Sequence, residues 1–177
     1  MKLEAKALEF ERSLVRYRIF DNRARLLWPS EVGHFVPWLT HRLDLLGDQL
    51  GLSLEYVATE AEVGDLRADL LARDGAGRRV IIEAQYGPSD HKHLGQLLTY
   101  ACAGDADVLI WVVVEDAPSR PIVREEHLKT LGELNERFAG EREFQAVEVL
   151  LESDPARSEA GEDGSRVIPR LRRRTCV

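Results

Sequence analysis

Along the chain, hydrophobic residues recur either about every 3.6 residues, which predicts a helix, or every second residue, which predicts a strand. Apolar residues fall at helical spacing between Pro29 and Gly51, and Ser30 is the expected N-cap of this helix. An alternation of apolar with polar or cationic residues predicts a strand within residues 3–20 and three more at residues 52–60, 66–73 and 79–85.

The remaining periodic segments complete an alternating order of helices and strands. A helix is predicted from Ser89 to near Gly104, and residues 108–114 are apolar on both faces, which is typical of a strand inside a sheet. Another helix is predicted over about 124–138, and a last strand over 144–151. The core order of helix, three strands, helix, strand, helix, strand predicts an α/β fold, with a mixed central sheet flanked by helices.

The composition changes near the C-terminus. A chain of 177 residues is the size of one domain, which we expect to cover residues 1–152. Residues 153–177 begin with an acidic stretch rich in Ser, Gly, Ala and Pro, and this composition predicts a disordered linker. A basic tail is expected to follow, with arginines at positions 166, 170, 172, 173 and 174.

Charge and cysteine content restrict the expected setting. The 24 Lys and Arg against 31 Asp and Glu give a net charge of −7, which disfavours non-specific wrapping of nucleic acid but allows a local basic patch. The longest apolar stretch, residues 108–114, is far shorter than the roughly 18 to 20 residues of a membrane span. The two cysteines form no CxxC pair, and the first residues are charged where a signal peptide is apolar. We therefore expect a cytoplasmic protein that does not bind a membrane.

Two acidic residues interrupt apolar strands on either side of the predicted hairpin turn at residues 74–77. Asp69 and Glu83 lie about equally far from this turn, so the hairpin places them nearly opposite each other. The strand period puts Gln85 on the same sheet face as Glu83. Two such carboxylates repel each other unless a cation lies between them, and oxygen ligands suit Mg²⁺ or Mn²⁺. The alternative is that both acids are ordinary residues of a solvated face.

This pattern resembles that of the PD-(D/E)XK nuclease superfamily, in which one strand carries an acid and the next carries (D/E)-x-K. Asp69 matches the first acid and Glu83 the second, while Ala68 stands in place of the proline and Gln85 in place of the lysine. The resemblance covers about residues 28–151.

A second element of the resemblance lies on the helix that follows. Gln96 and Tyr100 are similar to the QxxxY element of RecB-type nuclease domains. Together with residues 63–64, 68–71, 81–85 and 89–100, they look like an uncharacterised bacterial domain family placed in the same superfamily.

The resemblance implies a restriction-endonuclease-like core and a metal-dependent nuclease that hydrolyses phosphodiester bonds, with DNA as the expected substrate. Asp69, Glu83 and the carbonyl of Ala84 would bind Mg²⁺ or Mn²⁺, and Glu60 is a candidate for a further ligand. Gln85 would position the attacking water or the scissile phosphate, although a glutamine cannot accept or release a proton.

Nucleic-acid contacts are expected from two places. His91 and Lys92, in the first turn of a helix, could meet phosphate together with free backbone amides, and Gln96 and Tyr100 could contact a phosphate or base. A solvated helix start and a buried hydrogen bond are the respective alternatives. His91 and His93 point in different directions on a helix, which disfavours a zinc site. The tail arginines, among them Arg172 and Arg173, are candidates for backbone contacts.

Two other functions remain open at this point. A nucleic-acid-binding or regulatory module could keep this fold without efficient chemistry, as Gln85 in the lysine position suggests. A structural subunit or homodimer could instead use the leucine-rich helix at residues 39–50 as its interface.

Overall fold

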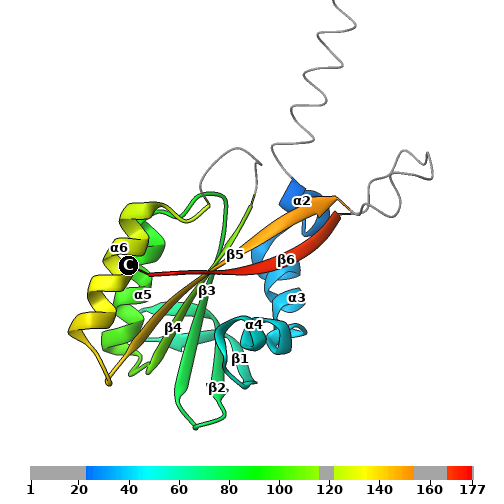
Figure 1. Ribbon diagram of the computed structural model, residues 1–177. Helices are drawn as coiled ribbons and strands as arrows, with labels where there is room; N and C mark the ends of the chain where they lie inside the picture. The colour runs from blue at the N-terminus through cyan, green and yellow to red at the C-terminus, as the bar shows by residue number, and fades with distance from the viewer. Residues whose placement is uncertain (1–22, 116–121, 154–166, 177) are drawn as a thin grey trace, which may run out of the picture.

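The computed structural model describes residues 23–115, 122–153 and 167–176, which form one six-stranded sheet with helices on both faces (Figure 1). The strands lie side by side in chain order: β1 Leu54–Val63, β2 Leu66–Asp74, β3 Arg79–Tyr86, β4 Val108–Val114, β5 Glu143–Ser153 and β6 Val167–Arg174. The pairs β1–β2, β2–β3 and β5–β6 are antiparallel, whereas β3–β4 and β4–β5 are parallel. The predicted α/β fold with a mixed sheet is confirmed.

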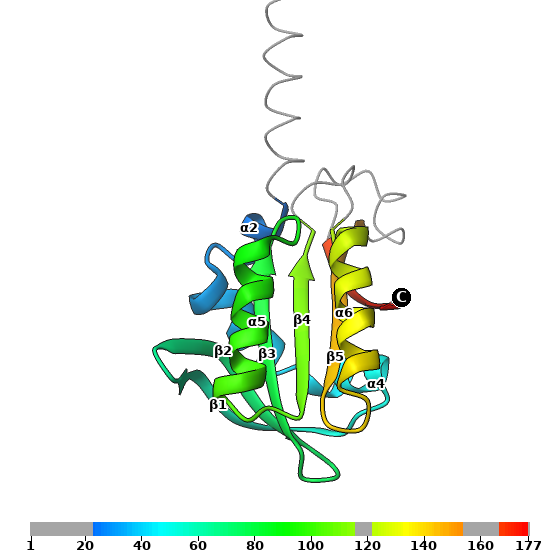
Figure 2. The same cartoon turned by 90° about the vertical axis from the view of Figure 1, so that its left-hand side faces the viewer.

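Two helical layers cover the sheet. The helices α5 His91–Ala103 and α6 Glu125–Arg137 pack on one face, where Figure 2 shows β4 running between them. The other face is covered by α2 Arg23–Leu27, the π-helical turn η1 Glu31–Phe35, α3 Val36–Thr40 and α4 Leu43–Leu50. Each layer buries its own hydrophobic cluster against the sheet, so β4 is buried on both faces, as its continuous apolar sequence predicts.

The helix predicted between Pro29 and Gly51 is divided into three pieces. Its ends are confirmed: Ser30 accepts a hydrogen bond from the amide of Gly33, and Gly51 ends α4 in the left-handed conformation, with φ of 71°. Pro37 falls in the first turn of α3, where its missing N–H needs no partner. A turn at residues 41–42 then separates α3 from α4.

The leucines of this region form part of the core. Leu39, Leu43, Leu46 and Leu50 are all buried in the cluster under the sheet. These four side chains are therefore not available to an interface, and Leu45 is the leucine of this segment that is exposed.

The hairpin between β2 and β3 has the predicted register. Asp74 stabilises its turn by accepting hydrogen bonds from the amides of Ala76 and Arg78, both at 2.9 Å. The ladder runs from Arg73↔Arg79 to Leu70↔Ile82. One step further along this register places Asp69 opposite Glu83.

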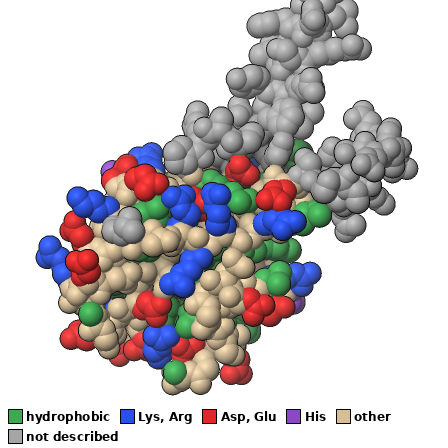
Figure 3. Space-filling model, in the orientation of Figure 1, with side chains coloured by type: hydrophobic (Ala, Val, Ile, Leu, Met, Phe, Trp, Pro, Cys, Tyr) green, Lys and Arg blue, Asp and Glu red, His purple; other side chains and the backbone are tan. Residues whose placement is uncertain are grey.

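The C-terminal arginines belong to the sheet, contrary to the prediction of a tail outside the core. Arg170, Arg172, Arg173 and Arg174 lie in β6, which pairs with β5 over its whole length, and Arg166 falls outside the described residues. Arg172 and Arg174 bind the carboxylate of Glu148, which is completely buried. This partner is more than twenty residues away in sequence, so a local reading of composition could not identify it. Figure 3 shows Lys and Arg side chains gathered on the face that carries β6.

Two predictions fall outside the described residues, namely the strand within residues 3–20 and the linker over most of 153–166. Within the described ranges, no helix is long and apolar enough to span a membrane.

Candidate active site

Along one edge of β3, acidic side chains accept the backbone hydrogen bonds that a neighbouring strand would otherwise accept. Beyond Leu70↔Ile82 the β2–β3 ladder ends, and the amide of Ala84 instead donates to Asp69 Oδ2 at 2.7 Å. Two residues further on, the amide of Tyr86 donates to Glu31 Oε2 at 2.9 Å. In a strand, the N–H and C=O of one residue face the same neighbour, so the carbonyl of Ala84 also faces this acidic edge.

Glu83 lies next to this edge in a buried position. Only 3% of its surface is exposed, and its Oε2 atom has no hydrogen-bond partner in the structure. None of the ion pairs found among the described residues involves Asp69 or Glu83. An ionised, buried carboxylate oxygen without a protein partner is costly, and a bound cation would remove this cost.

Burial changes the acidity of both groups. It raises the pKa of Asp69 to about 6, and the negative charges of Glu31 and Glu60 contribute, although the Ala84 amide acts against the shift. Burial also raises the pKa of Glu83 to about 8, with the charge of Asp69 as the next contribution. Each shift disfavours the ionised form, so a cation between the two carboxylates would relieve both.

Glu60 lies beside Asp69 across the β1–β2 pair. The neighbouring register pairs are Thr59↔Leu70 and Ala61↔Ala68, so Glu60 comes opposite Asp69. Its backbone is in the left-handed region, with φ of 51°, which is a strained conformation for a residue with a side chain. Glu60 is exposed, and it therefore borders the buried pair from the solvent side.

Glu31 is the site residue that sequence reasoning missed. It follows the N-cap Ser30, where an acidic residue is an ordinary stabilising feature of a helix start. Its negative charge raises the pKa of both Asp69 and Glu83, so it belongs to the same electrostatic cluster. No local signal distinguishes it, because its partner Tyr86 is 55 residues away.

The donor set fits Mg²⁺ or Mn²⁺. Asp69, Glu83 and the carbonyl of Ala84 offer hard oxygen ligands, and the unpartnered Glu83 oxygen would gain a partner. In the described part of the chain, no three His, Cys, Asp or Glu side chains are arranged together as metal ligands. A pair of carboxylates is nevertheless sufficient for Mg²⁺, which keeps several waters and binds substrate phosphates.

The face of α5 that carries Gln96 and Tyr100 covers the acid pair. The Tyr100 hydroxyl donates to the carbonyl of Arg67 at 2.8 Å, and its interaction with Glu83 opposes the increase in the pKa of Glu83. Gln96 Nε2 donates to the Tyr100 hydroxyl at 3.4 Å, and Gln96 Oε1 is buried without a partner. Tyr100 thus links α5 to β2 by a hydrogen bond, while the side-chain oxygen of Gln96 is an acceptor without a partner beside the acid pair.

Gln85 is held by protein partners. Its Oε1 accepts from the Trp111 indole at 3.1 Å, and its Nε2 donates to the Pro88 carbonyl at 2.8 Å and to Asp90 Oδ2 at 3.1 Å. With 3% of its surface exposed, the side chain has both amide hydrogens engaged. This arrangement does not favour the direct contact with water or phosphate that the sequence predicts.

The start of α5 separates its two histidines. Asp90 is the N-cap, and its side chain accepts from the His93 amide. His93 Nδ1 lies 2.8 Å from Asp90 Oδ1, whereas His91 Nδ1 lies 2.9 Å from Nε2 of the buried His127. Lys92 is exposed on the same turn, and its charge acts on Glu83.

The structure does not bring the C-terminal arginines to this cluster. Two strands, β4 and β5, lie between β3 and β6, so Arg172 and Arg173 are three strand spacings from Glu83, roughly 14 Å. Arg172 is bound to Glu148, and Arg173 is exposed.

No known family model and no curated protein matches this chain. Among solved structures, it is similar to SfsA of Pyrococcus furiosus in complex with Ca²⁺, with 18% identity over 73% of this chain and 57% of that one and a TM-score of 0.41. It is also similar to a repair endonuclease from Pyrococcus abyssi, with 15% identity over 58% of this chain and 43% of that one and a TM-score of 0.36. The chain therefore spans about half the length of these proteins.

Proposed function

We propose that this protein is a nuclease that uses Mg²⁺ or Mn²⁺ to hydrolyse phosphodiester bonds, with DNA as substrate. The observation that carries the proposal is the pair of Asp69 and Glu83 on adjacent strands, with a buried Glu83 oxygen that no protein group satisfies. An acid pair of this kind destabilises a metal-free fold, so its presence needs a functional reason.

The residues around the pair have separable roles in this proposal. Asp69, Glu83 and the carbonyl of Ala84 hold the cation, and Glu60 is placed to add a ligand from the solvent side. When bound, the cation would polarise the scissile phosphate and favour formation of hydroxide from water. Gln96, which has a buried acceptor without a partner, orients the substrate from α5.

Nucleic acid would be held by cationic groups around this centre. His91 and Lys92 are exposed at the start of α5, where Asp90 already accepts from the His93 amide, so the charge of the Lys92 side chain rather than the helix amides would attract a phosphate. Arg173 on β6 is exposed and has no ion-pair partner in the described residues, but it pairs with Val147 of the cluster on the other sheet face, so a phosphate that it contacts would lie away from the acid pair.

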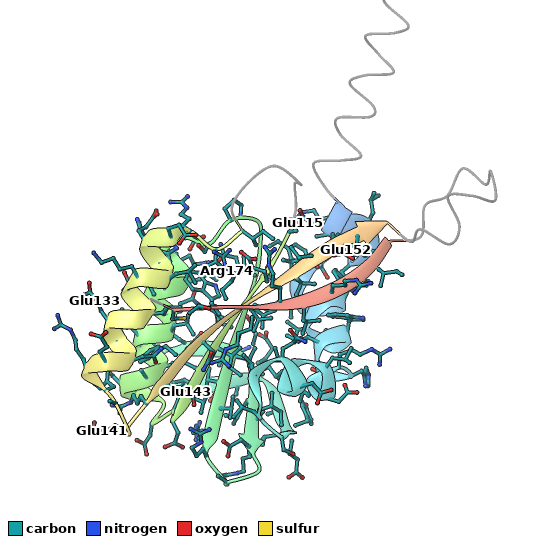
Figure 4. The ribbon with its side chains drawn as sticks, viewed as in Figure 1. Glu115, Glu133, Glu141, Glu143, Glu152 and Arg174 are labelled. Atoms are coloured by element: carbon teal, nitrogen blue, oxygen red, sulfur yellow. The ribbon has the colours of Figure 1, made fainter. Side chains whose placement is uncertain are left out.

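The test is cleavage of labelled single- and double-stranded DNA and RNA in Mn²⁺, in Mg²⁺ and in EDTA. Glu83→Gln and Asp69→Asn remove a charged ligand at nearly constant volume, and we expect each to lower the rate at least about 10³-fold. Glu133→Gln is the matched control, since Glu133 is exposed on α6, and Figure 4 shows it pointing away from the sheet. Full activity of a folded Glu83→Gln protein would contradict the proposal.

A second candidate is a nucleic-acid-binding module without efficient chemistry. It is favoured by one observation, namely that Gln85 takes the lysine position of the resembled superfamily and has its amide group engaged by Trp111, Pro88 and Asp90. Binding of DNA in both EDTA and Mn²⁺, without cleavage in either, would support this candidate.

A further inference from the structure

Asp90 and His93 form an oriented carboxylate–imidazole pair at the start of α5. Asp90 Oδ1 accepts from the His93 amide at 2.9 Å and contacts His93 Nδ1 at 2.8 Å. Burial acts to raise the pKa of Asp90, but the hydrogen bonds from His93 outweigh it and hold this pKa below its usual value. An ionised carboxylate can only accept hydrogen bonds, so Nδ1 carries the proton and Nε2 of the neutral ring is an acceptor.

Gln85 holds this pair from the sheet. Its Nε2 donates to the other Asp90 oxygen, Oδ2, at 3.1 Å, and its Oε1 is fixed by the Trp111 indole. Both oxygens of Asp90 are therefore engaged. The orientation of the imidazole is determined by a continuous series of hydrogen bonds from β4 through β3 to α5.

The His93 ring lies on the helix face that covers the acid pair. His93, Gln96 and Tyr100 follow each other at the i, i+3 and i+7 spacing that places side chains on one face of a helix. Tyr100 interacts with Glu83, and a positive charge on His93 would act on Asp69. The side chain of His93 is 16% exposed, and within the described residues its Nε2 has no hydrogen-bond partner. Water can therefore reach this nitrogen.

We propose that His93 is the general base of the reaction, with Asp90 and Gln85 as the positioning residues that orient it. The inference rests on the proposed nuclease function and extends it. In this proposal Gln85 acts through its hydrogen bond to Asp90 and not on the water itself. This role is compatible with an amide group whose hydrogens are both engaged.

The proposed step conserves atoms and charge. Nε2 of neutral His93 takes one proton from a water molecule while the water oxygen forms a bond to phosphorus. The bond between phosphorus and the leaving ester oxygen breaks, and its electron pair stays on that oxygen, which takes a proton from solvent. His93 then releases its proton to solvent. Water and a phosphodiester thus give a phosphomonoester and an alcohol.

The first experiment measures single-turnover hydrolysis by the full chain with saturating Mn²⁺. The probes are bis(p-nitrophenyl) phosphate and a labelled DNA duplex. We expect His93→Gln to lower both rates by about 10²- to 10⁴-fold, the usual contribution of a general base. The affinity for Mn²⁺ should stay the same, because Asp69 and Glu83 remain. His41→Gln is the matched control, since His41 is exposed at the end of α3, away from this cluster.

The second experiment tests the orientation of His93. Asn is as good an N-cap as Asp, so Asp90→Asn keeps the helix start but removes the negative charge beside the ring. The charged groups that face His93 are Asp90 on its own helix and Asp69 on β2. We expect a lower rate and a changed pH–rate profile at unchanged affinity for Mn²⁺, because the ring loses the carboxylate that orients it. An unchanged rate and profile would overturn the positioning role of Asp90.

The outcomes separate this inference from the function on which it rests. If the parent protein cleaves and His93→Gln cleaves within about threefold of it, His93 is not the base, and the nuclease function stands. If the parent binds Mn²⁺ but cleaves neither probe, the nuclease function fails and the role of His93 with it. If His93→Gln unfolds at the assay temperature, imidazole added to His93→Ala decides: a rise in rate supports the inference, and no rise overturns it.

Discussion

The carboxylate of Asp69 accepts a hydrogen bond from the amide of Ala84, with 2.7 Å between Oδ2 and N, at the point where the backbone ladder between β2 and β3 has ended. The side chain of Asp69 thus takes the place of a backbone carbonyl of β2 as the acceptor for the β3 amide. As a result, an acidic oxygen lies near the carbonyl of Ala84 and near Glu83 on the same strand. The buried acid pair and the end of strand pairing are one structural feature.

The first prediction concerns pH. The folded-state pKa values of Asp69 and Glu83, about 6 and about 8, lie above the ordinary values of 3.8 and 4.5. Their contribution to stability is therefore complete below about pH 4 and is lost as the pH rises towards 8. At about 1.4 kcal/mol per pKa unit, we expect the free energy of unfolding in EDTA to fall by several kcal/mol over this range. Urea titrations between pH 5 and 8 measure this free energy. A free energy of unfolding that does not change with pH would contradict the raised pKa values of the acid pair.

The second prediction concerns Glu83→Gln in the absence of metal. A neutral amide removes the cost of ionising a buried group, so the variant should be more stable than the parent at pH 8 in EDTA. The stability of Glu133→Gln should follow that of the parent. Thermal melts of the three proteins compare them directly, and a Glu83→Gln protein less stable than the parent would show that Glu83 is satisfied by the fold itself.

The third prediction concerns divalent cations. At pH 8, Mn²⁺ at 100 times its dissociation constant should stabilise the parent by about 2.7 kcal/mol, because it binds only the folded state. Asp69→Asn should lose most of this gain, whereas Glu133→Gln should retain it. Calorimetric melts with and without Mn²⁺ measure the difference. An equal gain in all three proteins would place the cation elsewhere.

The fourth prediction concerns the buried Glu148. It accepts from the Val123 amide and binds both Arg172 and Arg174. Replacing both arginines by Met should cost about 3–5 kcal/mol, because a buried charge loses its partners, and adding Glu148→Met should recover much of this loss.

Arg170 provides the control for this cycle on the same strand. Its ion pair with Glu152 is exposed, with side-chain exposures of 66% and 49%. Arg170→Met should therefore change stability by less than about 1 kcal/mol. Denaturant titrations compare the variants. A cost similar to that of the double variant would mean that strand pairing, and not Glu148, determines the effect.

The fifth prediction concerns Arg173. It is exposed and unpaired within the described residues, so Arg173→Ala should leave the melting temperature unchanged. If it contacts a phosphate, the variant should bind all DNA sequences more weakly and lower the slope of log affinity against log salt by about 0.9. Fluorescence anisotropy at several salt concentrations measures the slope, and an unchanged slope would exclude Arg173 from the interface.

The sequence by itself determined the elements and the central hairpin. Alternating patterns and the Asp74–Gly77 turn predict β2, β3 and their register, so the opposition of Asp69 and Glu83 follows from local signals alone. The apolar run of β4 and the helical periods of α5 and α6 are local in the same sense. These features depend on the period of side chains along a strand or helix, which neighbouring residues in the chain define.

Tertiary structure decided the rest. Glu31 joins the acid cluster through Tyr86, and Arg172 becomes part of a strand through Glu148, two contacts between residues far apart in the chain. The side-chain amide of Gln85 turns to Trp111 and Asp90 rather than to the acid pair. A sequence pattern gives the sheet face of a residue, but not the partner that its polar atoms select. That choice depends on which donors and acceptors remain unsatisfied once distant elements pack together.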